Sequence, residues 1–224
     1  MKVFFVGDSD IANWKPLNLP LGTLTKSGWT SFQVLKAIKS READSAVVGE
    51  GGAEEDFVVC ATWGENDVSN SGDMVSVKIA ANNTSEAIKQ LVANHKGHLK
   101  GVLFFGPKLE PWMFSDPLNV DTDAIMSYVR LSLELKSLFQ ECKELGVTFV
   151  DALSMFTDNP GRSTEEIMTE VQGLRVASKI VSADSFSFRV EEAFFCTDQL
   201  HLSEDGYSLW NDIVEAFIEE KKRE

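Results

Sequence analysis

The sequence predicts an α/β protein, a three-layer α/β/α sandwich around a mostly parallel, five-stranded sheet. Two observations support this fold class. Short, continuous apolar runs recur along the chain, and segments with apolar residues at helical spacing lie between them. Continuous apolarity is typical of strands that are covered on both faces. Strands that alternate with helices form mostly parallel sheets with helices on both sides.

The apolar runs give the positions of the strands. Four of them are strongly apolar and are predicted to be buried strands, and one weaker run is predicted to be a further strand. In chain order the ranges are 2–6, 20–25, 57–62, 101–105 and 147–150, of which 20–25 is the weaker one. A sheet of this kind is expected to have the strand order of flavodoxin.

Amphipathic segments separate these strands. The longest carries an apolar stripe on one side and ends at Gly146, a typical C-cap residue. Another begins with a capping box around Thr84. The predicted helices are 31–39, 84–94, 123–145, 164–180 and 206–221.

The remaining segments are predicted to be irregular. Residues 66–83 are rich in Gly, Ser, Asn and Asp, and residues 106–121 contain three prolines, so both ranges are expected to be long loops. The range 154–195 is the hardest to interpret. Within it, 186–190 alternates between apolar and polar residues like a strand, and the whole range could be an insertion beside the functional site.

Length and charge limit the possible functions. A chain of 224 residues can bury one substantial core, so a single domain over residues 1–224 is expected. The formal net charge is −14, which would repel nucleic acids and anionic membranes. Nucleic acid is therefore not an expected partner.

Cysteine usage and hydropathy point to an ordinary soluble protein. The three cysteines have neither the spacing of a zinc site nor a disulfide framework, and Cys60 is expected in the core. No apolar stretch is long enough for a membrane span. The first apolar run is too short for a signal peptide and leads directly into a polar motif, so a cytoplasmic location is expected.

Polar motifs follow the predicted strands. Gly7-Asp8-Ser9 ends the first apolar run, Gly64-Glu65-Asn66-Asp67 follows the third strand, and Asp198-x-x-His201 precedes the last helix. Because functional residues gather beyond the carboxyl ends of parallel strands, these motifs should face one crevice. A serine, an amide and an Asp/His pair supply a nucleophile, an oxyanion donor and an oriented base, as acyl transfer requires.

These residues resemble the SGNH (GDSL-type) hydrolase family over most of the chain. That family has four sequence blocks, which correspond here to Gly7-Asp8-Ser9, a glycine placed at Gly28, Gly64-Glu65-Asn66-Asp67 and Asp198-x-x-His201. The resemblance implies the SGNH hydrolase fold and a serine esterase that acts on carboxylic esters. Short-acyl or acetyl esters are the expected substrates, for the reason given below. It implies no cofactor and no metal.

The resemblance also implies a role for each site residue. Ser9 would be the nucleophile, His201 the general base and Asp198 the group that orients the base. The backbone N–H groups of Ser9 and Gly28 and the amide of Asn66 would form the oxyanion hole. The substrate would be a small-molecule, carbohydrate or lipid ester, and neither its identity nor the oligomeric state can be read from the sequence.

One position departs from the family pattern. The residue after the nucleophile, commonly leucine, is Asp10 in this chain. Its side chain leaves the backbone N–H of Ser9 intact, so catalysis should not depend on this difference. With Glu65, it should disfavour anionic esters.

Two other functions remain open. Asp8-x-Asp10 after an apolar strand resembles the motif of Mg²⁺-dependent, haloacid dehalogenase-type phosphatases, but that family explains neither Asn66 nor the Asp198/His201 pair. The chain could also be a non-catalytic binding module on the same fold. Taken singly, Ser9 could cap a helix, Asn66 and Gly28 could serve turns, and His201 could be a surface residue.

The acyl specificity can be predicted from two features. The short interval between Ser9 and Gly28 leaves no room for a large lid, so an open site that favours short acyl groups is expected. Four phenylalanines before Asp198 could line an acyl pocket, although packing in the core is the expected use. They are Phe186, Phe188, Phe194 and Phe195.

Overall fold

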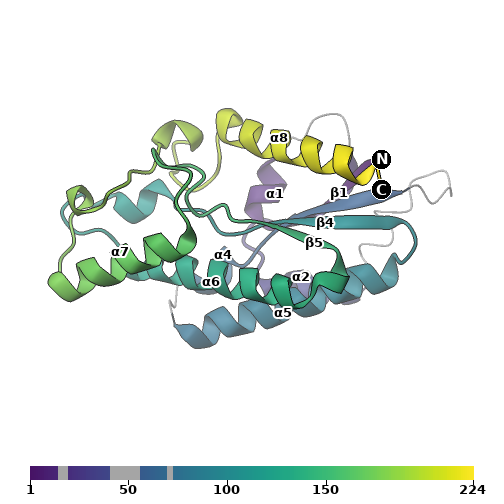
Figure 1. Cartoon of the computed structure of the whole chain (residues 1–224), viewed down its shortest axis with the longest axis horizontal. Coiled ribbons are helices and arrows are strands. Elements are labelled where there is room, and N and C mark those ends of the chain that lie inside the picture. Colours follow the sequence, from purple (N-terminus) through teal and green to yellow (C-terminus); the bar gives the residue numbers. More distant parts are fainter. Residues whose placement is uncertain (15–19, 41–55, 70–72) are drawn as a thin grey trace.

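A computed structural model describes residues 1–14, 20–40, 56–69 and 73–224. One sheet of five strands runs through its centre (Figure 1), and every neighbouring pair of strands is parallel. The strands are β1 (Lys2–Gly7), β2 (Pro20–Thr25), β3 (Phe57–Thr62), β4 (Leu99–Phe105) and β5 (Val147–Val150). Their order, β2-β1-β3-β4-β5, is that of flavodoxin. The predicted fold class is confirmed.

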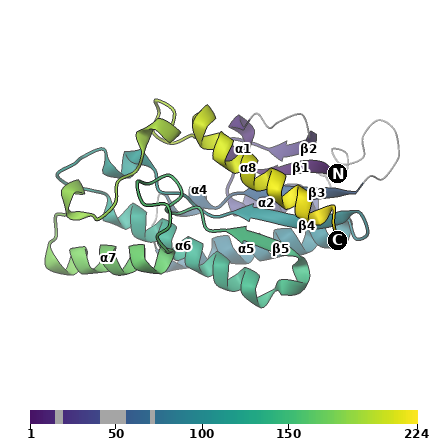
Figure 2. The same ribbon diagram turned by 45° about the horizontal axis from the view of Figure 1, so that its top comes forward.

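Helices cover both faces of the sheet. Figures 1 and 2 show α1 and α8 on one side and α2, α5 and α6 on the other. The α-helices are α1 (Ser9–Asn13), α2 (Ser31–Lys39), α4 (Glu65–Val68), α5 (Met74–Asn94), α6 (Thr122–Glu141), α7 (Thr164–Ala177) and α8 (Glu204–Lys221). Short 3₁₀ turns are η1 (Pro111–Phe114), η2 (Lys143–Leu145), η3 (Ala183–Ser185) and η4 (Glu192–Phe194).

The alternation of side chains along β1 explains the two hydrophobic layers. Val3 and Phe5 pack in the layer with Trp14 and Trp210, which belongs to α8. Phe4 and its neighbours on the same side of the strand pack with α2, α5 and α6. Successive residues of a strand point to opposite faces, so an unbroken apolar run is needed to fill both layers.

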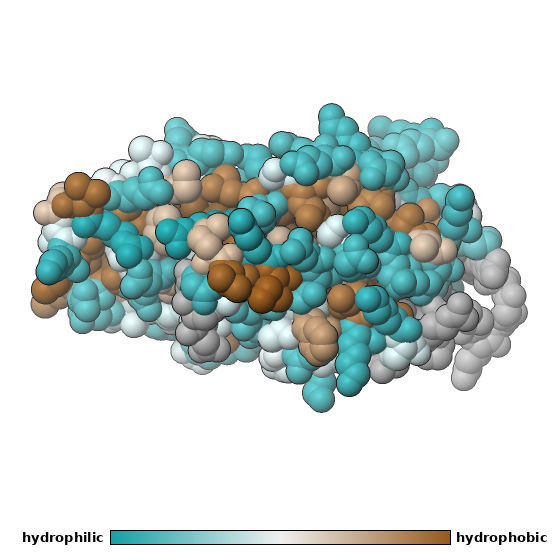
Figure 3. Space-filling model, turned by 90° about the horizontal axis from the view of Figure 1, so that it is seen from below, coloured by the Kyte–Doolittle hydropathy of each residue, from teal (hydrophilic) through white to brown (hydrophobic). Residues whose placement is uncertain are grey.

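The outer faces of the helices are mainly polar. Figure 3 shows the side of the molecule that α2, α5 and α6 cover, where hydrophilic residues predominate and apolar ones lie between them. Exposed apolar residues of these helices include Phe32, Val75 and Ile79. None of the helices in the described ranges combines the length and the apolarity that a crossing of the bilayer would require.

The predicted loop over 66–83 is wrong for its described residues. Residues 65–68 form α4, and α5 begins at Met74 rather than at Thr84. Asp73 caps this longer helix, because its Oδ1 accepts a hydrogen bond from the N–H of Ser76 at 2.8 Å. Val77 and Ala80 are fully buried against the core. Their packing outweighs the weak helix propensity of the surrounding Ser and Asn residues. Residues 70–72 lie outside the described ranges.

Two helix ends and one predicted strand also differ from the prediction. The helix expected over 164–180 ends at Ala177, and the one expected over 123–145 ends at Glu141 and continues as the 3₁₀ turn η2. Residues 186–190 do not form a strand, and Val190 makes only an isolated antiparallel bridge with Thr157. The alternation there arises because Phe186 and Phe188 turn into the core against Phe114.

Candidate active site

The site lies beyond the carboxyl ends of β1, β3 and β4. A pocket of about 380 Å³ opens there. Its lining residues come from α1, α4, α6, η1, the residues next to them and the segment before α8. They are Ser9, Asp10, Glu65, Asn66, Ser69, Glu110, Trp112, Tyr128, Asp198 and Leu200. Three of the five predicted site residues, Ser9, Asn66 and Asp198, therefore share one pocket.

A tight turn places Ser9 at the edge of this pocket. Gly7 ends β1 so close to β3 that a Cβ atom on it would lie 2.2 Å from the carbonyl oxygen of Thr62. The chain then enters α1, whose first residue is Ser9. Asp8 caps the helix by accepting a hydrogen bond from the N–H of Asp10 at 3.2 Å. Only 2% of Asp8 is exposed, whereas Ser9 is half-buried and faces the pocket.

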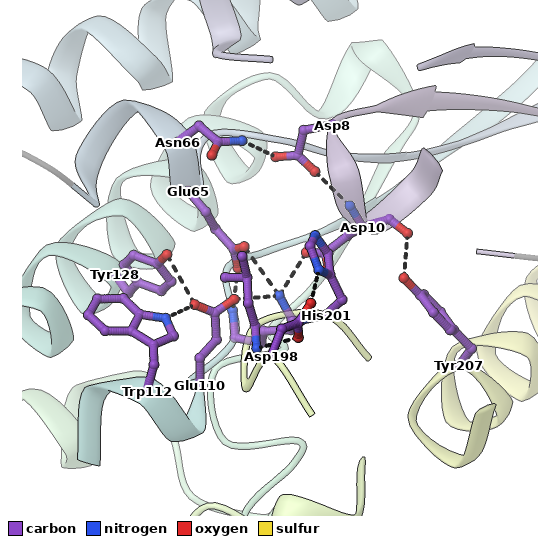
Figure 4. Close-up of polar contacts among 12 residues, drawn as sticks. Asp8, Asp10, Glu65, Asn66, Glu110, Trp112, Tyr128, Asp198, His201 and Tyr207 are labelled. Carbon is purple, nitrogen blue, oxygen red and sulfur yellow. Dashed lines mark hydrogen bonds and ion pairs between the residues drawn. The ribbon is translucent and has the colours of Figure 1, made fainter. Parts of the chain in front are cut away.

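Asn66 lines the same pocket, next to this turn. It belongs to α4, which begins after Gly64, a residue with the positive φ of 115° that favours glycine. The side-chain amide of Asn66 donates hydrogen bonds to the carbonyl oxygen of Trp29 at 3.1 Å and to Oδ2 of Asp8 at 3.3 Å. These two contacts fix the orientation of the amide beside the Ser9 turn, and Figure 4 shows the one to Asp8.

Asp198 and His201 form a hydrogen-bonded pair before α8. Oδ2 of Asp198 lies 2.7 Å from Nδ1 of His201. Its Oδ1 accepts hydrogen bonds from the backbone N–H groups of Leu200 and His201, at 3.0 and 3.1 Å. Partial burial raises the pKa of Asp198, but the hydrogen bonds from the His201 ring and from the two N–H groups outweigh it and hold the pKa at about 2.

The pairing defines which nitrogen of His201 is available. With an ionised Asp198 beside it, Nδ1 carries the proton and donates to the carboxylate. Nε2 is then the acceptor nitrogen, and it is buried without a hydrogen-bond partner among the described residues. His201 lines a second pocket that also includes Asp198, next to the first.

Gly28 lies in the turn between β2 and α2. Its φ of 78° falls in the left-handed region, which agrees with the turn role considered for it. It is exposed, and it does not belong to the residues that line the 380 Å³ pocket. Its role as an oxyanion donor stays a prediction.

Sequence reasoning missed a buried ion cluster beside Ser9. Lys108 and Glu110 follow β4, and they are 1% and 0% exposed. Nζ of Lys108 lies 2.7 Å from Oδ2 of Asp10, 2.8 Å from Oε1 of Glu110 and 3.3 Å from Oε2 of Glu65. We call these four residues the Lys108 cluster, and Figure 4 labels its three acidic residues. A signal existed, because two charged residues at the carboxyl end of a buried strand lie where functional groups gather.

The Lys108 cluster extends into the wall of the pocket. Oε1 of Glu65 accepts a hydrogen bond from the backbone N–H of Lys108 at 3.0 Å. Oε2 of Glu110 accepts from the indole N–H of Trp112 and from the hydroxyl of Tyr128. Both aromatic side chains line the pocket. The cluster therefore connects the Ser9 turn, α4 and the aromatic wall.

Burial and the neighbouring charges together set the protonation of this cluster. Burial by itself would lower the pKa of Lys108, but the neighbouring Asp10, Glu110 and Glu65 carboxylates raise it well above its usual range. Burial and the other carboxylates raise the pKa of Glu65 and of Glu110, although Lys108 opposes the shift. The ammonium is thus charged at neutral pH, and it is the one cation that the three carboxyl groups of the cluster share.

The phenylalanines that precede Asp198 do not line the pocket next to Ser9. Phe186, Phe188 and Phe195 are buried in the two hydrophobic layers, and Phe194 packs against Phe156. Their expected use in the core is confirmed. Cys60 is also buried, as expected.

Comparison with known proteins identifies solved structures with a similar fold. No protein-family model matches the chain, and no curated protein sequence matches it significantly. Among solved structures, a Bacteroides fragilis protein to which acylhydrolase activity has been ascribed is similar at 16% identity and a TM-score of 0.59, over 98% of this chain and 86% of that one. A GDSL-like lipase from Bacteroides thetaiotaomicron gives 15% identity and a TM-score of 0.56, over 98% and 88%.

A third similar structure is a variant of an acetylxylan esterase from Geobacillus stearothermophilus. It is 17% identical, with a TM-score of 0.51 over 98% of this chain and 93% of that one. At such identities the common property is the architecture. The chain has the three-layer fold of the SGNH hydrolases, as the sequence resemblance predicted.

Proposed function

We propose that this protein hydrolyses carboxylic esters, with Ser9 as nucleophile, His201 as general base and Asp198 as the residue that orients the base. One arrangement carries the proposal. Ser9, Asn66 and Asp198 come from distant parts of the sequence and line one pocket, and Asp198 binds Nδ1 of His201 while Nε2 has no hydrogen-bond partner among the described residues. A half-buried serine and an imidazole oriented by a carboxylate are the groups that acyl transfer needs.

In the proposed reaction the Ser9 hydroxyl attacks the ester carbonyl carbon. Nε2 of His201 accepts the hydroxyl proton, and the ionised Asp198 stabilises the imidazolium that forms. The imidazolium then protonates the alcohol as it leaves, and an acyl group remains on Ser9. Water releases this acyl group with His201 again as the base. The steps need no cofactor and no metal.

The negative oxygen of the tetrahedral intermediate requires donors. Ser9 is the first residue of α1, and the N–H groups of a first helical turn have no partner within their own helix. Asn66 supplies a side-chain amide, whose hydrogen bond to Asp8 is long at 3.3 Å and can be exchanged for one to the developing oxyanion. We propose Gly28 as the third donor, on the family resemblance alone.

A covalent probe provides the direct test. A fluorophosphonate should label the wild-type protein at one residue, Ser9, because only an activated serine displaces the leaving group from phosphorus at a useful rate. Mass spectrometry of the labelled peptide identifies the residue. The Ser9→Ala variant should not react, whereas Ser137→Ala, which changes an exposed serine on α6, should react like the wild type. Labelling at another serine would refute the nucleophile assignment.

The pocket supports a short acyl group on a soluble alcohol. Its walls carry Asp10, Glu65 and Glu110, and its volume of about 380 Å³ is small. The phenylalanines that could have extended it with an apolar surface are in the core. The acetylxylan esterase among the similar structures is consistent with an acetyl ester of a carbohydrate as one candidate substrate.

This pocket predicts the order of activity on model esters. p-Nitrophenyl acetate or butyrate should have a higher kcat/KM than the decanoate, because a long acyl chain would leave its apolar surface in water or against carboxylates. Initial rates over a series of chain lengths measure this directly. A clear preference for the decanoate would contradict the prediction.

The phosphatase alternative is not favoured by the geometry of its two aspartates. An aspartyl-phosphate mechanism needs an open nucleophilic carboxylate, but Asp8 is 2% exposed and both of its oxygens accept hydrogen bonds, from Asp10 and Asn66. Asp10 is paired with Lys108. Neither carboxylate is open to a phosphate in this arrangement.

A further inference from the structure

The Lys108 cluster lies outside the proposed triad but contacts the turns that carry it. Asp10 follows Ser9 directly in the chain, and Glu65 directly precedes Asn66. Lys108 Nζ binds both carboxylates, at 2.7 and 3.3 Å. Its third partner is Glu110, which holds Trp112 in the pocket wall. An ammonium has three N–H groups, so each of its hydrogens has a carboxylate acceptor.

We propose that Lys108 is a positioning residue for the esterase reaction: its ammonium fixes the turn that carries Ser9 relative to the turn that carries Asn66. This inference rests on the proposed function. Lys108 touches neither the substrate nor the reacting atoms in this proposal. It acts through the two residues next to Ser9 and Asn66 in the sequence.

The contacts are suited to this role. Hydrogen bonds between an ammonium and carboxylates are stronger than those between neutral groups, and burial removes the water that would weaken them. The direct side-chain contact between the two turns, from Asn66 to Asp8, is long at 3.3 Å. Lys108 adds an ionic connection between the same two turns: its Nζ lies 2.7 Å from Asp10 and 3.3 Å from Glu65, and its backbone N–H donates to Glu65 at 3.0 Å.

A second contact connects Asp10 to α8, the helix that follows His201 in the chain. The hydroxyl of Tyr207 in α8 donates a hydrogen bond of 2.8 Å to the backbone carbonyl of Asp10. α8 begins three residues after His201. The residue after the nucleophile is thus held by its side chain toward α4 and by its backbone toward the helix that follows the base.

Stability alone is a poor explanation for this cluster. Desolvating three carboxyl groups and one ammonium is costly, and well-packed apolar residues in place of a buried ion cluster often give equal or greater stability. Directional hydrogen bonds to the ammonium instead fix the positions of the turns that carry Ser9 and Asn66, and this precision affects the reaction rate. A displacement of about 1 Å between reacting groups can lower a rate on the order of 100-fold.

The test compares catalysis with binding in Lys108→Met, which keeps an unbranched side chain one atom shorter and removes its charge. Lys108→Met alone would leave three buried carboxyl groups without a cation. The double variant Lys108→Met/Asp10→Asn, which leaves two and keeps the net charge of the cluster unchanged, is therefore measured beside it. Both variants should lose about 10- to 100-fold in kcat for p-nitrophenyl acetate and in the rate of fluorophosphonate labelling at Ser9. In Lys108→Met, KM should stay within about twofold, since Lys108 does not belong to the residues that line the pocket.

A matched control separates misplacement from general destabilisation. Arg162→Met removes a partly buried ion pair with Glu170 at α7. Its melting temperature should fall, while kcat and labelling stay at the wild-type values. Circular dichroism verifies the fold of every variant. If Lys108→Met does not fold, the double variant decides the question.

The possible results distinguish a failure of the proposed function from a failure of the positioning role. Absence of labelling in the wild type would reject the proposed function itself. Wild-type labelling with equally fast labelling of the folded Lys108 variant would overturn the positioning role and leave the cluster a purely structural one. A rise in KM with unchanged kcat would also overturn it, because it would place Lys108 in substrate binding.

Discussion

Ser9→Ala and His201→Ala are each expected to lower ester hydrolysis by about 10³-fold or more, since the nucleophile and its base act as a unit. Neither change should alter the fold. Both side chains lie outside the two hydrophobic layers, so the melting temperature should stay near the wild-type value. Steady-state rates with p-nitrophenyl acetate, together with thermal melts, measure both effects.

Matched controls are available for both substitutions. Ser137→Ala changes an exposed serine of α6, and His98→Ala changes a histidine just before β4, at the amino end of the sheet and away from the pocket. Both control variants should keep wild-type turnover. More than a tenth of wild-type activity in Ser9→Ala would show that another group is the nucleophile.

Asn66→Ala should lower kcat by about 10²- to 10³-fold with little change in KM, because the amide interacts with charge that develops only in the transition state. The structure adds a second expectation. Asn66 also links Trp29 and Asp8, so a modest loss of thermal stability should accompany the loss of kcat. Steady-state kinetics and a thermal melt separate these two consequences.

Asn94→Ala is the control for this variant. It also removes a side-chain hydrogen bond, from Gln90 in the last turn of α5, but it lies outside the pocket. Its kcat should be unchanged. If Asn66→Ala lost stability but kept kcat, Asn66 would be a turn residue and the oxyanion hole would need another side-chain donor.

The pattern of apolar runs by itself determines much of the fold. All five strands lie where these runs predict them, because residues buried on both faces of a sheet must be apolar throughout. The Asp198–His201 pair can also be predicted from the sequence, since residues three apart in a turn can touch without any long-range information. The start of α5 cannot be predicted from the sequence in this way, because packing against the core outweighs a local composition typical of loops.

The Lys108 cluster was decided by the tertiary structure alone. Lys108 is 98 positions from Asp10 and 43 from Glu65. Their contact depends on the order of strands in the sheet, which brings the carboxyl ends of β1, β3 and β4 together. In the sequence, Asp10 is only an unusual residue after Ser9. In the fold it is a buried carboxylate with a counter-ion, because burial of a charge is tolerated where another charge is held against it.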